Sequence, residues 1–364
     1  MKRRQYLAVT GAGLGTLVAG CGFAHYGGAL RGETTLFGPD SRRHFVSTDD
    51  GFVIARRDRR LVQNDGVGFD QVTVTAVTGY ANEGYQQWST AIESASDGIA
   101  LGDSLVVLQE NHLTALDPTA TENNGDDSID PPIEWETTIN GLRWPIAAID
   151  EIVYVSTNET IAQVVDAEVT WTRTVPGAPQ SLYAHDGGVI ATTPEGLVAL
   201  DADGDENWTV ETDRQPFLDH QGNDVAFRND EAVSLLDRDD ATEHWRKSIP
   251  AGGYAPRMSD DAVVVPTGEG IIQFDRTTGN QEWQIQTGHR PHPVLVLGPT
   301  ATYSATADGT VLAIDSGEIT WEHVGDWTDD PLDSWIDNDQ VAVLYESGTV
   351  RRFQRTDQDV PIFS

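Results

Sequence analysis

The sequence predicts an all-β protein that folds as a β-propeller, and the first observation behind this is a regular spacing of tryptophans. Seven tryptophans follow one another through the 364-residue chain, and every step after the first is 36 to 38 residues long. A fixed period in this range is typical of repeat architectures, in which each repeat buries its apolar face against its neighbours. We therefore interpret these tryptophans as structural side chains that pack between repeats. They are Trp88, Trp135, Trp171, Trp208, Trp245, Trp283 and Trp321.

The second observation is a short apolar segment ending in Asp that precedes most of these tryptophans. The separation from Asp to Trp is longest between Asp117 and Trp135, where the Asp-, Asn- and Pro-rich run 121–132 is inserted. This insertion accounts for the one long tryptophan step. The strand-ending residues are Asp117, Asp166, Asp201, Asp237, Asp275 and Asp315.

The third observation is the pattern within one repeat. Residues 262–285 read AVVV, PTGEG, IIQFD, RTTG and QEWQI, which are short β-branched or aromatic runs bounded by turn residues. The same order recurs at 188–210 and 301–321, and no helical apolar stripe of three turns occurs between 45 and 354. Four short strands in roughly forty residues are typical of a propeller blade.

The repeat resembles a known family. The units GLVALDADGDENW (196–208), GIIQFDRTTGNQEW (270–283) and GTVLAIDSGEITW (309–321) are similar to the PQQ-like repeat of the quinoprotein-type propellers, in which a strand runs into Asp, a Gly turn and a docking Trp. The resemblance implies one propeller domain over 43–364, but the motif is specific for the fold and not for a function. The quinoprotein dehydrogenases also carry an adjacent Cys pair, and this chain has a single Cys, so we do not expect it to bind PQQ.

Degenerate copies of the repeat end near Thr78 and Gln354. With these copies we expect eight four-stranded blades, and seven is the alternative. The last copy has no Trp-bearing strand after it, so we expect the N-terminal strand at 44–48 to complete the ring.

The N-terminal residues 1–20 are typical of an export signal. Arg3 and Arg4 precede an apolar stretch and resemble a twin-arginine signal. The run Val-Ala-Gly before Cys21 resembles a lipobox, with cleavage before Cys21 and lipid on its sulfur. We therefore expect an extracytoplasmic protein anchored to the outer face of the cell membrane through Cys21, with 21–42 as a tether.

The charge balance narrows the possible partners. The chain has 58 acidic and 23 basic residues and a net charge of −35, and Lys2 and Lys247 are its lysines. Such an acidic, Lys-poor chain with this signal looks like a haloarchaeal exported protein, whose surface charge is screened at high salt. Nucleic-acid binding is not expected, because it requires clustered Lys or Arg. We expect a monomer.

No cofactor or metal site and no catalytic centre is expected. The run DADGDEN at 201–207 lacks the Gly and Glu that a calcium loop of the EF-hand type requires, and 121–130 is more typical of a solvated acidic loop, although calcium stays possible. His289 and His292 are separated by Pro, which prevents a helical pair of zinc ligands. No GxSxG elbow or activated thiol is present.

Two sequons begin at Asn158 and Asn207, and both are possible glycosylation sites. We expect Asn158 to be accessible in a hairpin turn and Asn207 to be occluded by the neighbouring Trp208.

We expect a non-catalytic scaffold that binds a protein or cell-surface component. Loops expected between the first and second strands of the blades carry aromatic, Arg and Pro residues and predict a binding rim. The alternatives are a redox enzyme subunit that binds PQQ or a metal, and a polysaccharide-binding module. The expected rim residues are Arg143, Trp144, Tyr183, Tyr254 and Arg290.

Overall fold

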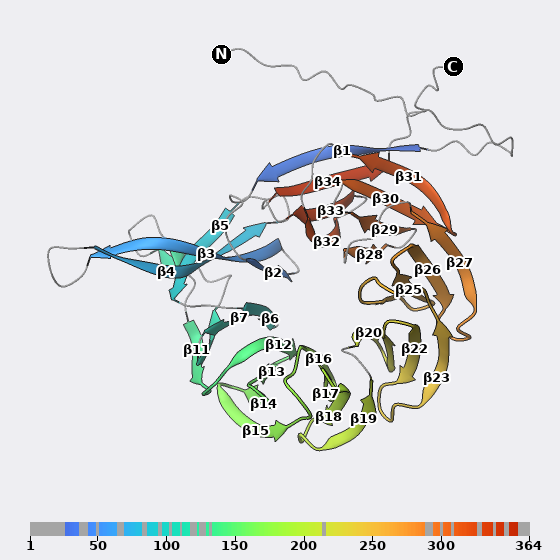
Figure 1. Ribbon diagram of the computed structural model, residues 1–364. Coiled ribbons are helices and arrows are strands. Elements are labelled where there is room, and N and C mark those ends of the chain that lie inside the picture. Colours follow the sequence, from blue (N-terminus) through green and yellow to red (C-terminus); the bar gives the residue numbers. More distant parts are fainter. Residues whose placement is uncertain are drawn as a thin grey trace, which may run out of the picture.

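The chain folds into a ring of twisted β-sheets around a central axis, as the computed structural model shows (Figure 1). The structure describes residues between Tyr26 and Arg355 with gaps, and it is continuous over 133–212 and 216–287. Every regular element in these parts of the chain is a β-strand. Within them, nothing forms a helix long and apolar enough to cross a membrane.

Six sheets of the described chain have four antiparallel strands, which confirms the expected all-β repeat. In each, the earliest strand lies nearest the centre of the ring and the latest lies outermost (Figure 1). The strands are β2 (Arg43–Thr48), β3 (Gly51–Gln63), β4 (Phe69–Ala81) and β5 (Gln86–Glu93); β6 (Asp97–Leu101), β7 (Ser104–Gln109), β8 (His112–Leu116) and β11 (Ile133–Thr138); β12 (Arg143–Ile149), β13 (Ile152–Ser156), β14 (Thr160–Val165) and β15 (Glu168–Thr174); β16 (Ser181–His185), β17 (Gly188–Thr193), β18 (Gly196–Asp201) and β19 (Glu206–Glu211); β20 (Phe217–Gln221), β21 (Asp224–Arg228), β22 (Ala232–Asp237) and β23 (Glu243–Ser248); β24 (Arg257–Met258), β25 (Ala262–Pro266), β26 (Gly270–Asp275) and β27 (Gln281–Gln286).

A further sheet of eight strands joins the two ends of the chain. Strand β1 pairs with β34 in antiparallel register and with β31 in parallel register, so it links two groups of strands (Figure 1). The sheet consists, in order, of β28 (Leu295–Leu297), β29 (Thr302–Ala305), β30 (Thr310–Asp315), β31 (Glu318–Val324), β1 (Tyr26–Thr35), β34 (Thr349–Arg355), β33 (Gln340–Tyr345) and β32 (Pro331–Asp337).

The position of β1 corrects two expectations. Residues 44–48, expected to complete the ring, lie in β2 and pair with β3, whereas Tyr26–Thr35 occupies the place beside β34. The expected tether 21–42 therefore contains a strand. Its glycines gave the segment a linker-like composition, but the otherwise unpaired edge of β34 requires a partner strand. The blade number, eight or seven, stays a prediction.

The insertion at 121–132 contains a short hairpin. Strands β9 (Glu122–Asn123) and β10 (Ile129–Asp130) pair with each other, and they fall between β8 and β11 in the chain. The other residues of this insertion lie outside the described part of the chain.

Burial follows the position of a strand in its sheet. All six residues of β17 and the first five of β18 are buried, whereas β19 is exposed on alternate residues around buried Trp208. The middle strands pack against neighbouring sheets on both faces, so their sequences are continuous apolar runs. An outermost strand contacts the next sheet on one side only, which leaves Trp as its main apolar anchor.

Three tryptophans connect consecutive sheets by a repeated hydrogen bond. Each lies on an outermost strand, and its indole Nε1 donates to a backbone carbonyl in the next sheet along the chain. Each acceptor is the residue that follows a strand-ending Asp. The pairs are Trp171 with Ala202 at 2.9 Å, Trp208 with Arg238 at 2.7 Å and Trp245 with Arg276 at 2.8 Å.

The turn that follows the Asp also packs against the tryptophan of the preceding sheet. Gly204, Gly279 and Gly317 have φ of +79°, +65° and +81°, and a Cβ on each would lie 2.6 Å from the side chain of Trp171, Trp245 and Trp283 respectively. Glycine is required at these positions because the backbone is left-handed and because the tryptophan side chain leaves no room for a Cβ. The Asp–Gly turn and the Trp of the sequence repeat thus meet at each of these interfaces.

The other tryptophans vary in environment. Trp321 is buried and packs against Tyr303, with ring centroids 6.0 Å apart. Trp135 is half-buried against the core between two sheets. Trp88 pairs in register with Gly79 on β4, and its side chain lies outside the described part of the structure.

Candidate binding surface

One face of the ring carries the turns between the second and third strands of each sheet. It also carries the connections from each outermost strand to the next sheet, and we call it the loop face. Backbone hydrogen bonds join the two kinds of segment: the first residue after an outermost strand donates its N–H to the carbonyl of a Glu in the turn. These bonds are Val175 to Glu159 at 2.9 Å, Thr212 to Glu195 at 3.0 Å and Ile249 to Glu231 at 2.9 Å.

Side-chain hydrogen bonds hold these turns further. Asn229 Oδ1 accepts from the N–H groups of Glu231 and Ala232 at 3.1 and 2.9 Å. Thr267 Oγ1 accepts from the N–H groups of Glu269 and Gly270 at 3.3 and 3.1 Å. Because the turns are fixed in this way, groups that they display have defined positions.

Four of these turns display a glutamate at the same position, directly before the third strand. We call this set the Glu ring. Its members are exposed, and 36 to 38 residues separate successive members in the chain. We did not identify them from the sequence, although they share the period of the tryptophans. The Glu ring consists of Glu159, Glu195, Glu231 and Glu269.

Apolar and aromatic groups lie inward of the Glu ring. Phe217, at the start of innermost strand β20, is 43% exposed, and Tyr254 is half-buried in the connection before β24. Next to Tyr254 in the chain, Gly253 lies beside the buried side chain of Arg228. The guanidinium of Arg228 donates from Nη1 to the carbonyl of Pro266 at 2.6 Å. Burial lowers the pKa of Arg228. Gly253 has φ of +106°, and a Cβ on it would lie 2.5 Å from Nη1 of Arg228, so only glycine fits beside this side chain.

The loops of the expected rim occupy a different place in the repeat from the one we predicted. They connect the outermost strand of one sheet to the innermost strand of the next, as 139–142 does between β11 and β12. The prediction was wrong because each Trp-bearing strand is the last strand of its sheet. The irregular loop that follows it therefore leads to the next sheet and is not a hairpin turn within one sheet. Arg143 and Trp144 lie on β12, where Arg143 is exposed. The side chain of Trp144 and all of Arg290 lie outside the described part of the structure.

Tyr183 lies on a strand and packs against the apolar cluster between two sheets. It is on innermost strand β16, and its ring meets His220 of β20 edge-on with centroids 6.0 Å apart. Burial raises the pKa of Tyr183, while hydrogen bonding to Ser181 opposes this shift. Asp219 beside it accepts from the N–H of Met258 at 2.8 Å, so this carboxylate joins two innermost strands.

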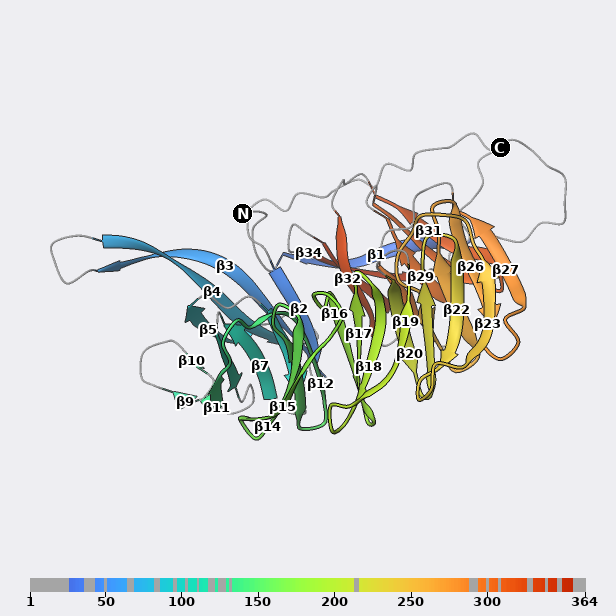
Figure 2. The same cartoon turned by 60° about the horizontal axis from the view of Figure 1, so that its bottom comes forward.

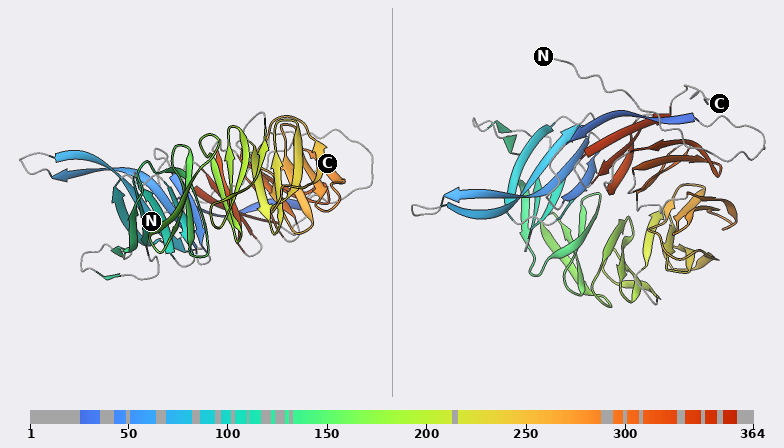
Figure 3. Two further views of the ribbon diagram at one scale, coloured as in Figure 1. Left: turned by 90° about the horizontal axis from the view of Figure 1, so that it is seen from below. Right: turned by 45° about the horizontal axis from the view of Figure 1, so that its top comes forward.

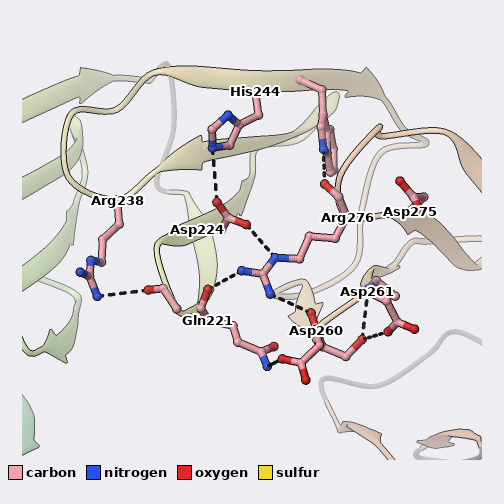
Figure 4. Close-up of polar contacts among 12 residues, drawn as sticks. Gln221, Asp224, Arg238, His244, Asp260, Asp261, Asp275 and Arg276 are labelled. Atoms are coloured by element: carbon pink, nitrogen blue, oxygen red, sulfur yellow. Dashed lines mark hydrogen bonds and ion pairs between the residues drawn. The ribbon is translucent and has the colours of Figure 1, made fainter.

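The opposite face carries polar contacts between sheets, drawn in Figure 4. Arg276 donates to Asp224 Oδ2 at 2.7 Å and to the carbonyl of Gln221 at 2.7 Å, and both acceptors belong to the preceding sheet. Asp224 also lies 3.3 Å from His244 Nε2. Arg238 pairs likewise with Asp186 of the sheet before it at 2.8 Å. These groups are used in holding adjacent sheets together.

A cavity of about 990 Å³ lies between the sheet of β24–β27 and strands β28–β31. Its lining includes half-buried Trp283 and the acidic residues Asp260, Glu282 and Asp315. Among the described residues, no group of three or more His, Cys, Asp and Glu side chains could hold a metal ion.

The two sequons are both exposed. Asn158 lies in the turn between β13 and β14, as expected. Asn207 was expected to be occluded, but it is also exposed, because alternation along β19 places it on the opposite face from buried Trp208. Arg3, Arg4 and Cys21 lie outside the described residues.

Comparison with known proteins agrees with this architecture. Residues 220–331 match the family described as outer membrane protein assembly factor BamB. The structure is similar to BamB from Moraxella catarrhalis at 16% identity and a TM-score of 0.64, covering 91% of this chain and 98% of that one. No curated protein matches the chain by sequence.

Two further solved structures are similar in fold. The computationally designed Ika8 protein has 14% identity and a TM-score of 0.68, over 88% of this chain and 98% of that chain. Sqt1 from Saccharomyces cerevisiae has 9% identity and a TM-score of 0.64, over 92% and 99%. Such low identities establish the fold and leave the function open. The chain is therefore a β-propeller whose residues 220–331 carry PQQ-like repeats.

Proposed function

We propose that the chain is a non-catalytic scaffold that binds a protein or cell-surface component on its loop face. The observation that carries this proposal is the Glu ring, four exposed carboxylates at equivalent positions on turns fixed by hydrogen bonds. A rigid surface loses little conformational entropy when a partner binds. The family matched by residues 220–331 is described as an assembly factor. A role in binding or assembling other proteins is consistent with the Glu ring on the loop face.

The partner surface that fits the loop face has basic groups at its rim and an apolar centre. Carboxylates of the Glu ring would attract and orient it, whereas Phe217 and Tyr254 would supply the apolar contact area. The twin-arginine motif at Arg3 and Arg4 and the lipobox ending at Cys21 support binding outside the cytoplasm by a lipid-anchored protein.

Crosslinking in native membranes, followed by identification of the captured species, tests this function. The first variant changes all four residues of the Glu ring to Gln, which removes four charges and preserves the side-chain volume. Its matched control changes four exposed glutamates near the start of the outermost strands of the same sheets. The control residues are Glu168, Glu206, Glu243 and Glu282.

We expect the Glu-ring variant to lose the captured partner and the control to retain it, with unchanged far-ultraviolet circular dichroism in both. Retention of the same partner by both variants would show that the loop face is not the binding surface. Alanine at Arg143 and Tyr254 then separates contacts at the expected rim from those of the Glu ring.

A further inference from the structure

A long hairpin extends from the sheet that contains β2 to β5. Strands β3 and β4 have 13 residues each, whereas β12 and β15, from the continuous part of the chain, have seven. Their pairing runs without interruption from Gly51 opposite Ala81 to Gln63 opposite Phe69. The hairpin projects well beyond the ring (Figures 1 and 2), and Figure 3 shows the same projection from two further directions.

The outer part of this hairpin is a two-stranded ribbon. Pairing of β2 with β3 ends at Arg43 opposite Arg56, and pairing of β5 with β4 ends at Glu93 opposite Val74. Residues 57–63 and 69–73, which we call the arm, therefore pair only with each other among the described strands. Its longer strand extends for roughly 23 Å at about 3.3 Å per residue. Both of its edges carry unpaired backbone groups, and a two-stranded ribbon alone is marginally stable in water.

Arginines are concentrated in the arm and at its base. Four occur in the five positions 56–60, in a chain with 23 basic residues and a net charge of −35. Arg57 and Arg59 lie opposite Thr75 and Thr73, while Arg56 and Arg60 lie opposite Ala76 and Val72. None of the four thus has an acidic residue as its partner in the β3–β4 register.

The base of the arm places two like charges opposite each other. Arg43 on β2 is the register partner of Arg56 on β3. Like charges directly opposite on neighbouring strands destabilise a sheet. Since successive residues of a strand lie on alternate faces, Arg57 and Arg59 share one face of the ribbon, and Arg56 and Arg60 share the other. Asp58 and Asp70 lie on the face of Arg56 and Arg60, whereas the face of Arg57 and Arg59 carries no carboxylate in the arm. An anionic ligand on the Arg57 and Arg59 face would offset their charge.

We propose that the arm binds an extended acidic segment of a partner protein by strand addition. Its unpaired edges offer alternating N–H and C=O groups, which another polypeptide can satisfy and a lipid headgroup cannot. Its arginines supply charge-assisted hydrogen bonds to carboxylates. The arm is an extension of a turn between second and third strands, so it starts from the loop face but forms a binding element separate from the Glu ring.

Binding of synthetic peptides to the full-length chain tests the proposal. The probe is an acetylated and amidated peptide of alternating Val and Glu, labelled for fluorescence anisotropy. The comparison peptides are the same sequence with an N-methyl group on every backbone amide, which leaves neither edge a donor, and alternating Val and Lys. Arg57→Ser combined with Arg59→Ser removes charge and keeps the backbone, and Arg246→Ser with Arg257→Ser is its control, because these two arginines are exposed on the ring.

We expect the Val-Glu peptide to bind more weakly as salt rises, and its affinity to fall at least about tenfold in the arm variant but not in the control. The N-methylated and Lys peptides should not bind. Equal affinity of the arm variant, or of the N-methylated peptide, overturns the proposal. Arg57- and Arg59-dependent binding to phosphatidylglycerol vesicles without peptide binding overturns it in favour of a lipid surface. Arm-dependent self-association in sedimentation, again without peptide binding, overturns it in favour of a second copy.

Discussion

Replacing Gly279 by Ala should destabilise the ring by more than its backbone conformation alone predicts. Gly279 has φ of +65°, and in this region an L-residue costs about 1–2 kcal/mol relative to Gly. A Cβ at this position would also lie 2.6 Å from Cγ of Trp245 and 2.8 Å from Cε of Lys247. Relieving such an overlap in a packed interface costs typically another 1–3 kcal/mol. We therefore expect a total of roughly 2–5 kcal/mol.

Gly141 supplies a matched control. Its φ is +75°, and a Cβ on it would meet no atom within 4 Å. Gly141→Ala should then cost only the backbone contribution of about 1–2 kcal/mol. The two contributions are measured together by guanidinium denaturation followed by far-ultraviolet circular dichroism, which does not depend on the emission of Trp245.

A double-mutant cycle isolates the contact. In a Trp245→Ala background the overlap with the indole is absent, and the remaining contact is with the end of the flexible Lys247 side chain. Gly279→Ala should then cost about as much as Gly141→Ala. If Gly279→Ala and Gly141→Ala lower stability equally in the wild-type background, the glycine of the repeat serves only the turn. The packing explanation of the Gly–Trp pair would then be refuted.

Four further predictions follow from the contacts and the sequence. Trp245→Phe should cost about 1–2 kcal/mol, because the carbonyl of Arg276 loses its 2.8 Å hydrogen bond, and a denaturation midpoint equal to that of the wild type would contradict this. Burial, with Arg238 and His220 nearby, lowers the pKa of His185 from 6.5 to about 4, so the unfolded state binds the proton first and stability should fall by about 3 kcal/mol as pH drops from 6.5 to 4. The free energy of unfolding of the His185→Leu variant, measured by urea denaturation at each pH, should fall less over the same window. An identical pH dependence in the variant and the wild type would argue against the His185 contribution. Cys21→Ser should move the protein from the membrane to the soluble fraction without a change in thermal midpoint, and continued membrane association would exclude the lipid anchor. Calorimetric titration with PQQ and calcium in high salt should give no heat, whereas saturable heat would support the redox alternative.

The sequence predicted the repeated parts of the fold well because the same physical requirement recurs in each sheet. Trp208 and Trp245 pack as expected from their period. The turns that contact the preceding tryptophan follow Asp201, Asp237, Asp275 and Asp315. The middle strands were recognisable because burial on both faces leaves continuous apolar runs such as β17 and β18.

The non-repeated parts were harder to predict because their structure depends on distant partners. Strand β1 looked like a linker, since nothing in its own residues indicates the open edge of β34. Tyr183 was expected at the binding rim beside a loop, but it lies on β16 with its ring packed against the next sheet. The Glu ring shares the repeat period, but exposed Glu is common in an acidic chain, so its position became evident only when the turns were placed on one face.

The short distance in the chain between Cys21 and β1 limits how the propeller would lie at a membrane. Strand β1 begins at Tyr26, only five residues after the proposed lipid site. Five extended residues span at most about 18 Å. The ring would therefore be held beside the bilayer near the junction of β1 with β31, without the freedom to tumble that a 22-residue tether over 21–42 would have given. A partner would then meet the protein in a restricted orientation, because β1, the strand that joins the two ends of the chain, would also be the attachment point to the membrane.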